Sequence, residues 1–301
     1  MESRELRSPE RVRLAQAEAP GLAAPARSSH PAARATSEHG AARGGLGEAW
    51  EFRELLFFLA WRDVKVRYKQ TLLGVLWAVI QPLFTMAIFT VLFGRLANVP
   101  SEGVPRPIFY FSALLPWLYI ANTVSNASMS LVSNANLLTK IYFPRFMLPA
   151  AVTLSGLVDF FVGSLLLIGF IAYYHISIGW IALLWPALVV LMVLLALAIS
   201  LFLAALNVKY RDVKYAVPFA VQLWMFATPV IYPTSLVPAR FQPYLALNPA
   251  TGLIEAFRHI LAPSTPMRWD LLGISAAATL VAILAGFAFF QRTERSFADL
   301  I

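Results

Sequence analysis

The chain has 301 residues, of which 59% are hydrophobic and only 13% are charged, with a formal net charge of +8 at pH 7. Soluble domains carry about 25% charged residues, so this composition excludes an ordinary soluble fold and predicts an all-α polytopic membrane protein. The chain has no cysteine, which excludes disulfides and cysteine-ligated metals, and no metal site is expected. The cations lie beside apolar segments, which indicates membrane topology and not nucleic-acid binding.

The first 49 residues form a tail that differs from the rest of the chain. It is rich in Ala, Arg, Pro, Ser and Gly, and residues 1–47 contain no Ile, Phe, Trp or Tyr. Such a segment cannot bury enough apolar surface to offset its ordering entropy, so we expect disorder over 1–49. It also lacks an apolar core of signal-peptide length, so it is not expected to be a cleaved targeting sequence.

Residues 50–70 are expected to form an amphipathic helix that lies in the membrane interface. At helical spacing, one face gathers the charged side chains Glu51, Glu54, Arg62, Lys65 and Lys69, around Phe58. The other face gathers the apolar side chains Leu55, Leu56, Leu59, Trp61, Val66 and Tyr68. A span follows almost at once, which argues against an ordinary soluble helix.

Hydropathy predicts six spans within a permease domain over 71–301, each near the ~20 residues that cross ~30 Å of hydrocarbon. These spans are 71–94, 108–132, 150–174, 180–206, 216–234 and 271–291. Between the last two, Asn248 as a cap and Pro249 at the first helical position predict a short helix. We expect short re-entrant gate helices here that dip into the outer leaflet.

The distribution of Lys and Arg predicts the orientation. With the amino terminus inside, most of the cations outside the tail fall in cytoplasmic segments. The outside segments then carry only Arg95, Arg106, Arg240, Arg258 and Arg268. Both termini are therefore expected in the cytoplasm.

Catalytic patterns are absent from the sequence, and one acidic residue lies inside a span. Asp159 has no Lys, Arg, His or Glu at comparable depth, so a structural role facing the bundle interior and a direct transport role both remain open. No H-E-x-x-H, G-x-S-x-G or G-x-x-x-x-G-K-[ST] motif occurs. We therefore expect a non-enzymatic chain that binds no cofactor, with ATP and Mg²⁺ held by a partner on the cytoplasmic side.

Aromatic residues are abundant, with 22 Phe, 10 Tyr and 8 Trp. They could pack the bundle or form an interfacial belt. A subset could instead line a path, since aromatic faces stack on the C–H-rich sides of sugar rings. The candidates for such a path are Trp77, Phe84, Trp117, Tyr119, Trp224, Phe226 and Tyr232.

The segment LLTKIYFPRFMLPAA, residues 137–151, mixes Lys140, Pro144 and Arg145 with large apolar side chains between two spans. In the cytoplasm, the cations could meet carboxylates of a partner while the apolar side chains fill a groove. Alternatively, the cations anchor the span ends at lipid headgroups.

Six blocks of the sequence, in order, resemble the permease subunits of bacterial ATP-binding-cassette exporters for cell-surface polysaccharides such as O-antigen, capsule and teichoic acid chains. The blocks are RDVKVRYKQTLLGVLWAVIQPL, NANLLTKIYFPRFMLP, LNVKYRDVKYAVPF, TPVIYP, LNPATGLIEAFRHIL and ERSFADLI.

The resemblance implies a homodimer in the bacterial inner membrane, with two copies of a separate ATPase subunit and a central channel for a lipid-linked polysaccharide. It also implies that 134–149 holds a coupling helix, with Asn136, Leu137, Lys140, Tyr142, Phe143, Pro144 and Arg145 as its contact residues. Two alternatives stay open: an exporter of the same architecture for a small amphipathic drug or lipid, and a membrane-embedded glycosyl- or phosphotransferase.

Overall fold

The computed structural model describes residues 51–69, 74, 76–140, 143–261 and 267–294, which fall in one compact unit over Gly45–Ile301. All secondary-structure elements in these residues are helices, and no strand occurs among them, which confirms the all-α prediction. The predicted tail over 1–49 and its boundary with the helix that follows lie outside the described residues.

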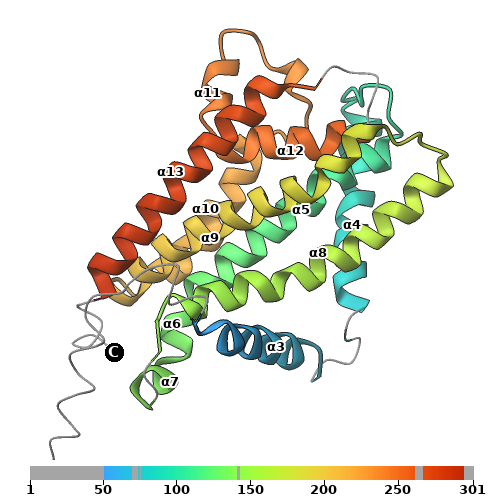
Figure 1. Cartoon of the computed structure of the whole chain (residues 1–301). Coiled ribbons are helices and arrows are strands. Elements are labelled where there is room, and N and C mark those ends of the chain that lie inside the picture. Colours follow the sequence, from blue (N-terminus) through green and yellow to red (C-terminus); the bar gives the residue numbers. More distant parts are fainter. Residues whose placement is uncertain (1–50, 70–73, 75, 141–142, 262–266, 295–301) are drawn as a thin grey trace, which may run out of the picture. The chain divides into compact units, whose positions relative to one another are not determined.

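The helices follow one another in a single series (Figure 1). The first half of the series is α3 (Arg53–Lys69), α4 (Leu76–Phe89), the π-helix η2 (Thr90–Leu96), α5 (Arg106–Ser128), α6 (Ser130–Ser133), α7 (Ala135–Lys140) and α8 (Met147–Tyr173). The second half is η3 (Trp180–Leu184), α9 (Trp185–Lys209), α10 (Val213–Ala227), η4 (Thr234–Leu236), α11 (Gln242–Ala246), α12 (Pro249–His259) and α13 (Trp269–Glu294).

Five segments are long and apolar enough to cross a membrane, which confirms a multi-pass protein. They are Leu76–Leu96, Arg106–Ser128, Met147–Tyr173, Trp180–Lys209 and Trp269–Glu294. The predicted fifth span, 216–234, corresponds to α10, which has 15 residues and ends at Ala227. Thr228 has extended backbone angles and Pro229 follows it, so the helix stops earlier than hydropathy predicted.

The helix α5 is the core of the bundle. It packs against α4, α8, α9, α10 and α12, and its residues from Ile108 to Leu114 are almost completely removed from solvent. A helix that is apolar on all sides is stable only when neighbours surround it. The helices α4 and α10, in contrast, bury few of their side chains: α4 buries only Pro82 and Met86, and α10 only Val217 and Val221.

Contacts between side chains fix the directions in which the long helices run. Tyr119 of α5 donates a hydrogen bond to the carbonyl oxygen of Thr153 at 2.9 Å, and Phe111 lies 5.7 Å from Phe170 between ring centroids. Residue numbers fall along α5 as they rise along α8, so these two helices are antiparallel.

The helices α9 and α13 instead run parallel. Ala198 lies against Gly286, and one turn further along both helices Phe202 packs on Phe289 with ring centroids 4.7 Å apart. Because α9 and α13 run in the same direction, the chain between them has to return from one end of the bundle to the other.

The predicted helix before the first span is present as α3. Its inner side, including Leu55 and Leu59, packs against α8 and the core beside it. Phe57, Phe58 and Trp61 are exposed, so large apolar side chains lie on both sides of α3, which differs from the single apolar face that we predicted. A position in the membrane interface stays a prediction.

The short helix predicted from the Asn248–Pro249 pair is confirmed as α12. The Asn248 side chain accepts a hydrogen bond from the backbone N–H of Ala250 at 3.1 Å, which caps the helix. Together with η4 and α11, α12 fills the segment between α10 and α13. Whether these short helices enter the outer leaflet stays a prediction.

Candidate functional site

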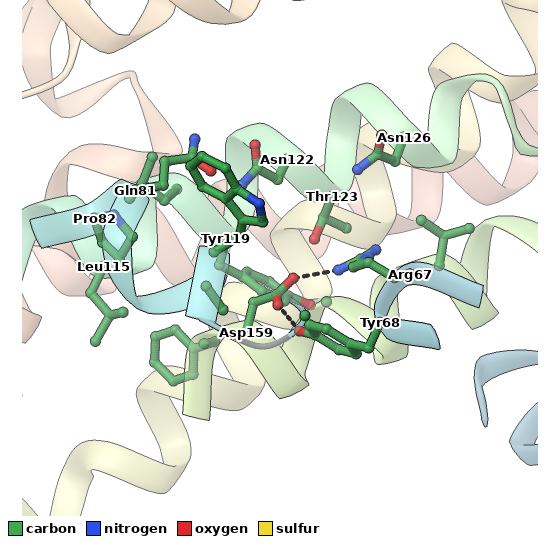
Figure 2. A pocket seen from close by; sticks show the side chains of 17 residues that line it. Arg67, Tyr68, Gln81, Pro82, Leu115, Tyr119, Asn122, Thr123, Asn126 and Asp159 are labelled. Carbon is green, nitrogen blue, oxygen red and sulfur yellow. Dashed lines mark hydrogen bonds and ion pairs between the residues drawn. The ribbon is translucent and has the colours of Figure 1, made fainter. Parts of the chain in front are cut away.

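Asp159 of α8 joins two side chains from the last turn of α3. The Arg67 guanidinium forms an ion pair with Asp159 Oδ2, and the Tyr68 hydroxyl donates to Oδ1 (Figure 2). Burial, and next the hydrogen bond to Asp159, raise the pKa of Tyr68, so its hydroxyl stays protonated and keeps donating. The contacts of Arg67 and Tyr68 with Asp159 therefore connect α3 to α8.

Asp159 was expected to be buried, but its side chain is 32% exposed. The reason is that it lines a cavity of about 310 Å³ enclosed by α4, α5, α8 and the end of α3. Its cationic partner, Arg67, comes from α3, a helix that was expected to lie outside the spans.

The cavity has a polar wall contributed by two spans (Figure 2). Gln81 of α4 and Asn122 and Asn126 of α5 line it with exposed amide side chains. Thr123 also lines it, and its buried hydroxyl has no hydrogen-bond partner among the described residues. The wall is completed by aromatic and aliphatic groups, which include Trp77, Leu115, Tyr119, Val152 and Phe160.

Sequence reasoning missed these amides, although a signal was available. Asn122 and Asn126 are four residues apart in an apolar span and so share one helix face. Amide side chains in a span are costly unless they meet water, a ligand or another polar group.

The seven aromatic residues proposed to line a path do not form one continuous set within the chain. Trp77, Phe84 and Phe226 have side chains that are more than half exposed. Trp117 and Tyr119 are buried within the bundle instead. Trp117 packs edge-on against Trp224 with ring centroids 5.2 Å apart.

Trp224 and Tyr232 line a second, more open groove of about 520 Å³ beside α11 and the start of α12, together with Phe241 and Tyr244. Asn248 organises this groove. It accepts from Trp224 Nε1 at 2.9 Å and donates to Thr228 Oγ1 at 2.8 Å while it caps α12. The end of α10 is thereby joined to the start of α12.

Arg258 makes a second connection between the same elements. Its side chain is 2% exposed, and it donates to the carbonyl oxygens of Pro229 at 2.8 Å and Val230 at 3.1 Å. It also pairs with Glu255 at 3.1 Å. Burial raises the pKa of Glu255, and the charge of Arg258 opposes that shift. From the sequence alone, Arg258 was expected only as one cation of an outside segment.

The residues proposed for partner coupling are placed in two different ways. Asn136 and Lys140 of α7 are exposed, whereas Leu137 is partly buried on the neighbouring core. Phe143 is only 5% exposed and packs in the chain's own interior with Leu59 and Met147. This position removes Phe143 from the docking surface that we expected it to form.

Pro144 and Arg145 are partly exposed, and Tyr142 lies outside the described residues. Arg145 Nη1 donates to the backbone oxygen of Glu294 at 3.1 Å, and its Nε lies 4.0 Å from Glu294 Oε1. A cation at the carboxyl end of a helix is favourable, so Arg145 stabilises the end of α13.

The segment that includes α6 and α7 is also joined to α3. Arg62 Nη2 donates to Asn134 Oδ1 at 3.1 Å, and Leu59 shares a buried cluster with Leu131 and Phe143. The helix α3 thus contacts the α5–α8 connection near its middle and the Asp159 cavity at its end.

Comparison with known proteins places this architecture in a family. The chain matches the family described as ABC-2 type transporter over residues 54–262. It is 31% identical over 257 residues to the O-antigen export system permease protein RfbA of Myxococcus xanthus, which covers 84% of this chain and 98% of the relative.

Two further relatives are similar over most of their length. The RfbA permease of Klebsiella pneumoniae is 25% identical over 252 residues, 82% of this chain and 95% of that protein. The polysialic acid transport protein KpsM of Escherichia coli is 24% identical over 241 residues, 78% of this chain and 92% of that protein. The chain belongs to the ABC-2 type transporter family of membrane permeases, and the resemblance noted in the sequence is confirmed.

Proposed function

We propose that the chain is the membrane subunit of an ATP-driven exporter that moves a lipid-linked, O-antigen-like polysaccharide across the bacterial inner membrane. One observation carries the proposal: the 31% identity to an O-antigen export permease extends over 98% of that relative. Two copies of a separate ATPase subunit would bind ATP and Mg²⁺ and supply the energy.

The exposed faces of α4 and α10 support a homodimer with the path at its centre. Both helices flank α5. The helix α10 buries only Val217 and Val221, while Phe219 and Phe226 are more than half exposed. A second copy packed near these faces would place exposed aromatic side chains, with Phe84 of α4 among them, around a common path.

The parallel course of α9 and α13 supports six crossings with both termini in the cytoplasm. Because α9 and α13 run in the same direction, the segment from the end of α9 to the start of α13 has to return to the side on which α9 begins. An odd number of crossings is therefore needed there, and one crossing is the simplest. The helix α10 is the apolar element available there. Its 15 residues span about 22 Å, and the turn after Ala227 would complete the passage.

The α5–α8 connection supports coupling to the ATPase in a form that differs from the original expectation. Exposed Asn136 and Lys140 would touch the partner, while buried Phe143 and helix-capping Arg145 would hold the segment rigid. A rigid connection transmits displacement of a docked partner to α5, α8 and α3.

The experiment that tests the function is deletion of the gene in the source bacterium, followed by complementation. We expect loss of surface polysaccharide with accumulation of lipid-linked chains inside the cell, and restoration by the wild-type gene. Lys140→Glu should restore little export at normal protein levels, whereas Lys140→Arg should restore it. Unchanged surface polysaccharide in the deletion strain, with altered export of a lipid or drug, would contradict the proposed cargo.

A further inference from the structure

The cavity beside Asp159 presents polar groups that the described part of the chain leaves without partners. The side chains of Gln81, Asn122 and Asn126 are exposed on spans that are predominantly apolar. No hydrogen bond joins these amides to other described residues, and the Thr123 hydroxyl is buried without one. Three free amides and a hydroxyl on membrane helices require water or a polar ligand between them.

The charges in the cavity indicate what kind of ligand would fit. Arg67 is already paired with Asp159, and Tyr68 donates to the same carboxylate. An anionic group would have to displace Asp159 from Arg67 and would then face an uncompensated carboxylate. An uncharged ligand avoids this cost and still finds donors and acceptors in the amides.

The shape and the remaining wall restrict the ligand further. Trp77, whose side chain is more than half exposed, supplies an aromatic face in the wall that also holds the amides, and the largely buried Tyr119 and Phe160 lie behind it. Aromatic faces bind the C–H side of a sugar ring while amides bind its hydroxyls. A volume of about 310 Å³ lies at the lower end of the roughly 300–1,000 Å³ typical of small-ligand pockets, which suits a short piece of glycan and not a whole chain.

We propose that this cavity is a binding subsite for one or two uncharged sugar residues of the exported polysaccharide, held by Asn122, Asn126 and Gln81. The inference rests on the proposed function, because only a carbohydrate cargo brings such residues to the permease. In this proposal the Arg67–Asp159 pair shapes one wall and adds no net charge to the site.

The test is direct binding to the purified full-length chain in lipid nanodiscs. The probe is the surface polysaccharide of the source bacterium, freed from its lipid by mild acid, and inorganic pyrophosphate is the anionic competitor. The test variant is Asn122→Ala/Asn126→Ala. The matched control is Ser125→Ala on the same helix, whose hydroxyl donates to the carbonyl of Ala121 at 2.7 Å and does not line the cavity.

We expect saturable binding of the glycan to the wild-type chain. The double variant should bind it about tenfold or more weakly, because two hydrogen bonds are lost. Ser125→Ala should bind it within about twofold of the wild-type affinity. Pyrophosphate should not displace the glycan. Equal binding by the double variant, displacement by pyrophosphate, or no glycan binding to the wild-type chain would each overturn the subsite.

Two further readouts separate this inference from its alternatives. If the double variant changes the oligomeric state in chemical cross-linking, the amides face a second copy and the subsite is wrong. Export by complementation distinguishes the two levels of the proposal: a wild-type gene that fails to restore export contradicts the proposed function. If the wild-type gene restores export and the double variant binds and exports the glycan as well as the wild type does, the proposed subsite is wrong but the proposed function stands.

Discussion

Asp159 and Arg67 lie 92 positions apart in the sequence and form an ion pair at the wall of the cavity. Breaking such a pair leaves one charge without its partner in a partly desolvated place. Asp159→Asn should therefore lower the free energy of unfolding by about 1–3 kcal/mol. Chemical unfolding of the purified protein in mixed micelles would measure the change.

A double-mutant cycle provides the control. Arg67→Leu together with Asp159→Leu removes both charges, so the double variant should be more stable than the sum of the two single effects predicts. Strict additivity of the two changes would show that the pair contributes no coupling energy.

Arg258 offers a second prediction, since its guanidinium serves two backbone carbonyls and Glu255 inside the protein. Lysine keeps the charge but cannot reach these acceptors with a planar fork. Arg258→Lys should cost about 3–5 kcal/mol, as expected when a buried charge loses its partners. Thermal unfolding should show this loss, while Arg240→Lys at an exposed position should change little; equal effects would contradict the connecting role.

Glycines at close helix contacts determine how the elements pack. A Cβ on Gly286 would lie 2.5 Å from the Ala198 carbonyl oxygen of α9. Gly286→Ala should therefore separate α9 from α13 and destabilise the protein by about 1–3 kcal/mol. Gly273→Ala on the same helix meets nothing within 4 Å and should be neutral or stabilising by up to about 1 kcal/mol. Similar melting temperatures for the two variants would contradict the close contact.

Arg145 joins the α5–α8 connection to the end of α13. Arg145→Glu should reduce protein levels, since it places a carboxylate beside Glu294. Adding Glu294→Arg should restore the attraction and the levels, measured by membrane immunoblot. If the double variant reaches normal levels but does not export, Arg145 also acts on the partner; if it fails to recover, the contact with Glu294 is not the cause.

The topology of the whole molecule can be tested without removing any native thiol, because the chain has no cysteine. Single cysteines at Ser101, Thr139 and Arg292 probe three segments. With six crossings, an impermeant maleimide should label Ser101→Cys in intact spheroplasts and should reach Thr139→Cys and Arg292→Cys only after permeabilisation. Labelling of Thr139→Cys and Arg292→Cys from opposite sides would contradict a crossing by α10.

Hydropathy predicted the long helices well because apolar length is a local property of the sequence. The cap of α12 was also predictable, since Asn248 and Pro249 act on their own helix. The end of α10 was not predictable from hydropathy, because residues 228–234 are apolar enough to extend the predicted span. Backbone preferences near Pro229 and bonds from distant Arg258 and Asn248 determine that turn.

The candidate site could be predicted only in part. Asp159 was recognised as an unusual carboxylate, and the amides of Asn122 and Asn126 could have been recognised from their spacing. The pairing of Asp159 with Arg67 could not be predicted from the sequence, because the position of Arg67 depends on how α3 folds back on α8. For the same reason, Phe143 looked like a contact residue in the sequence and proved to be an interior one.

The paired connections made by Asn248 and Arg258 have a consequence for motion. The turn after α10 and the helix α12 are held together at both ends of α12, by Thr228 at its start and by Pro229 and Val230 near its finish. Such a unit tilts as a rigid body more easily than it rearranges internally. Any opening beside the second groove would therefore be set by hinges that flank the unit, and not by the rotation of single side chains inside it.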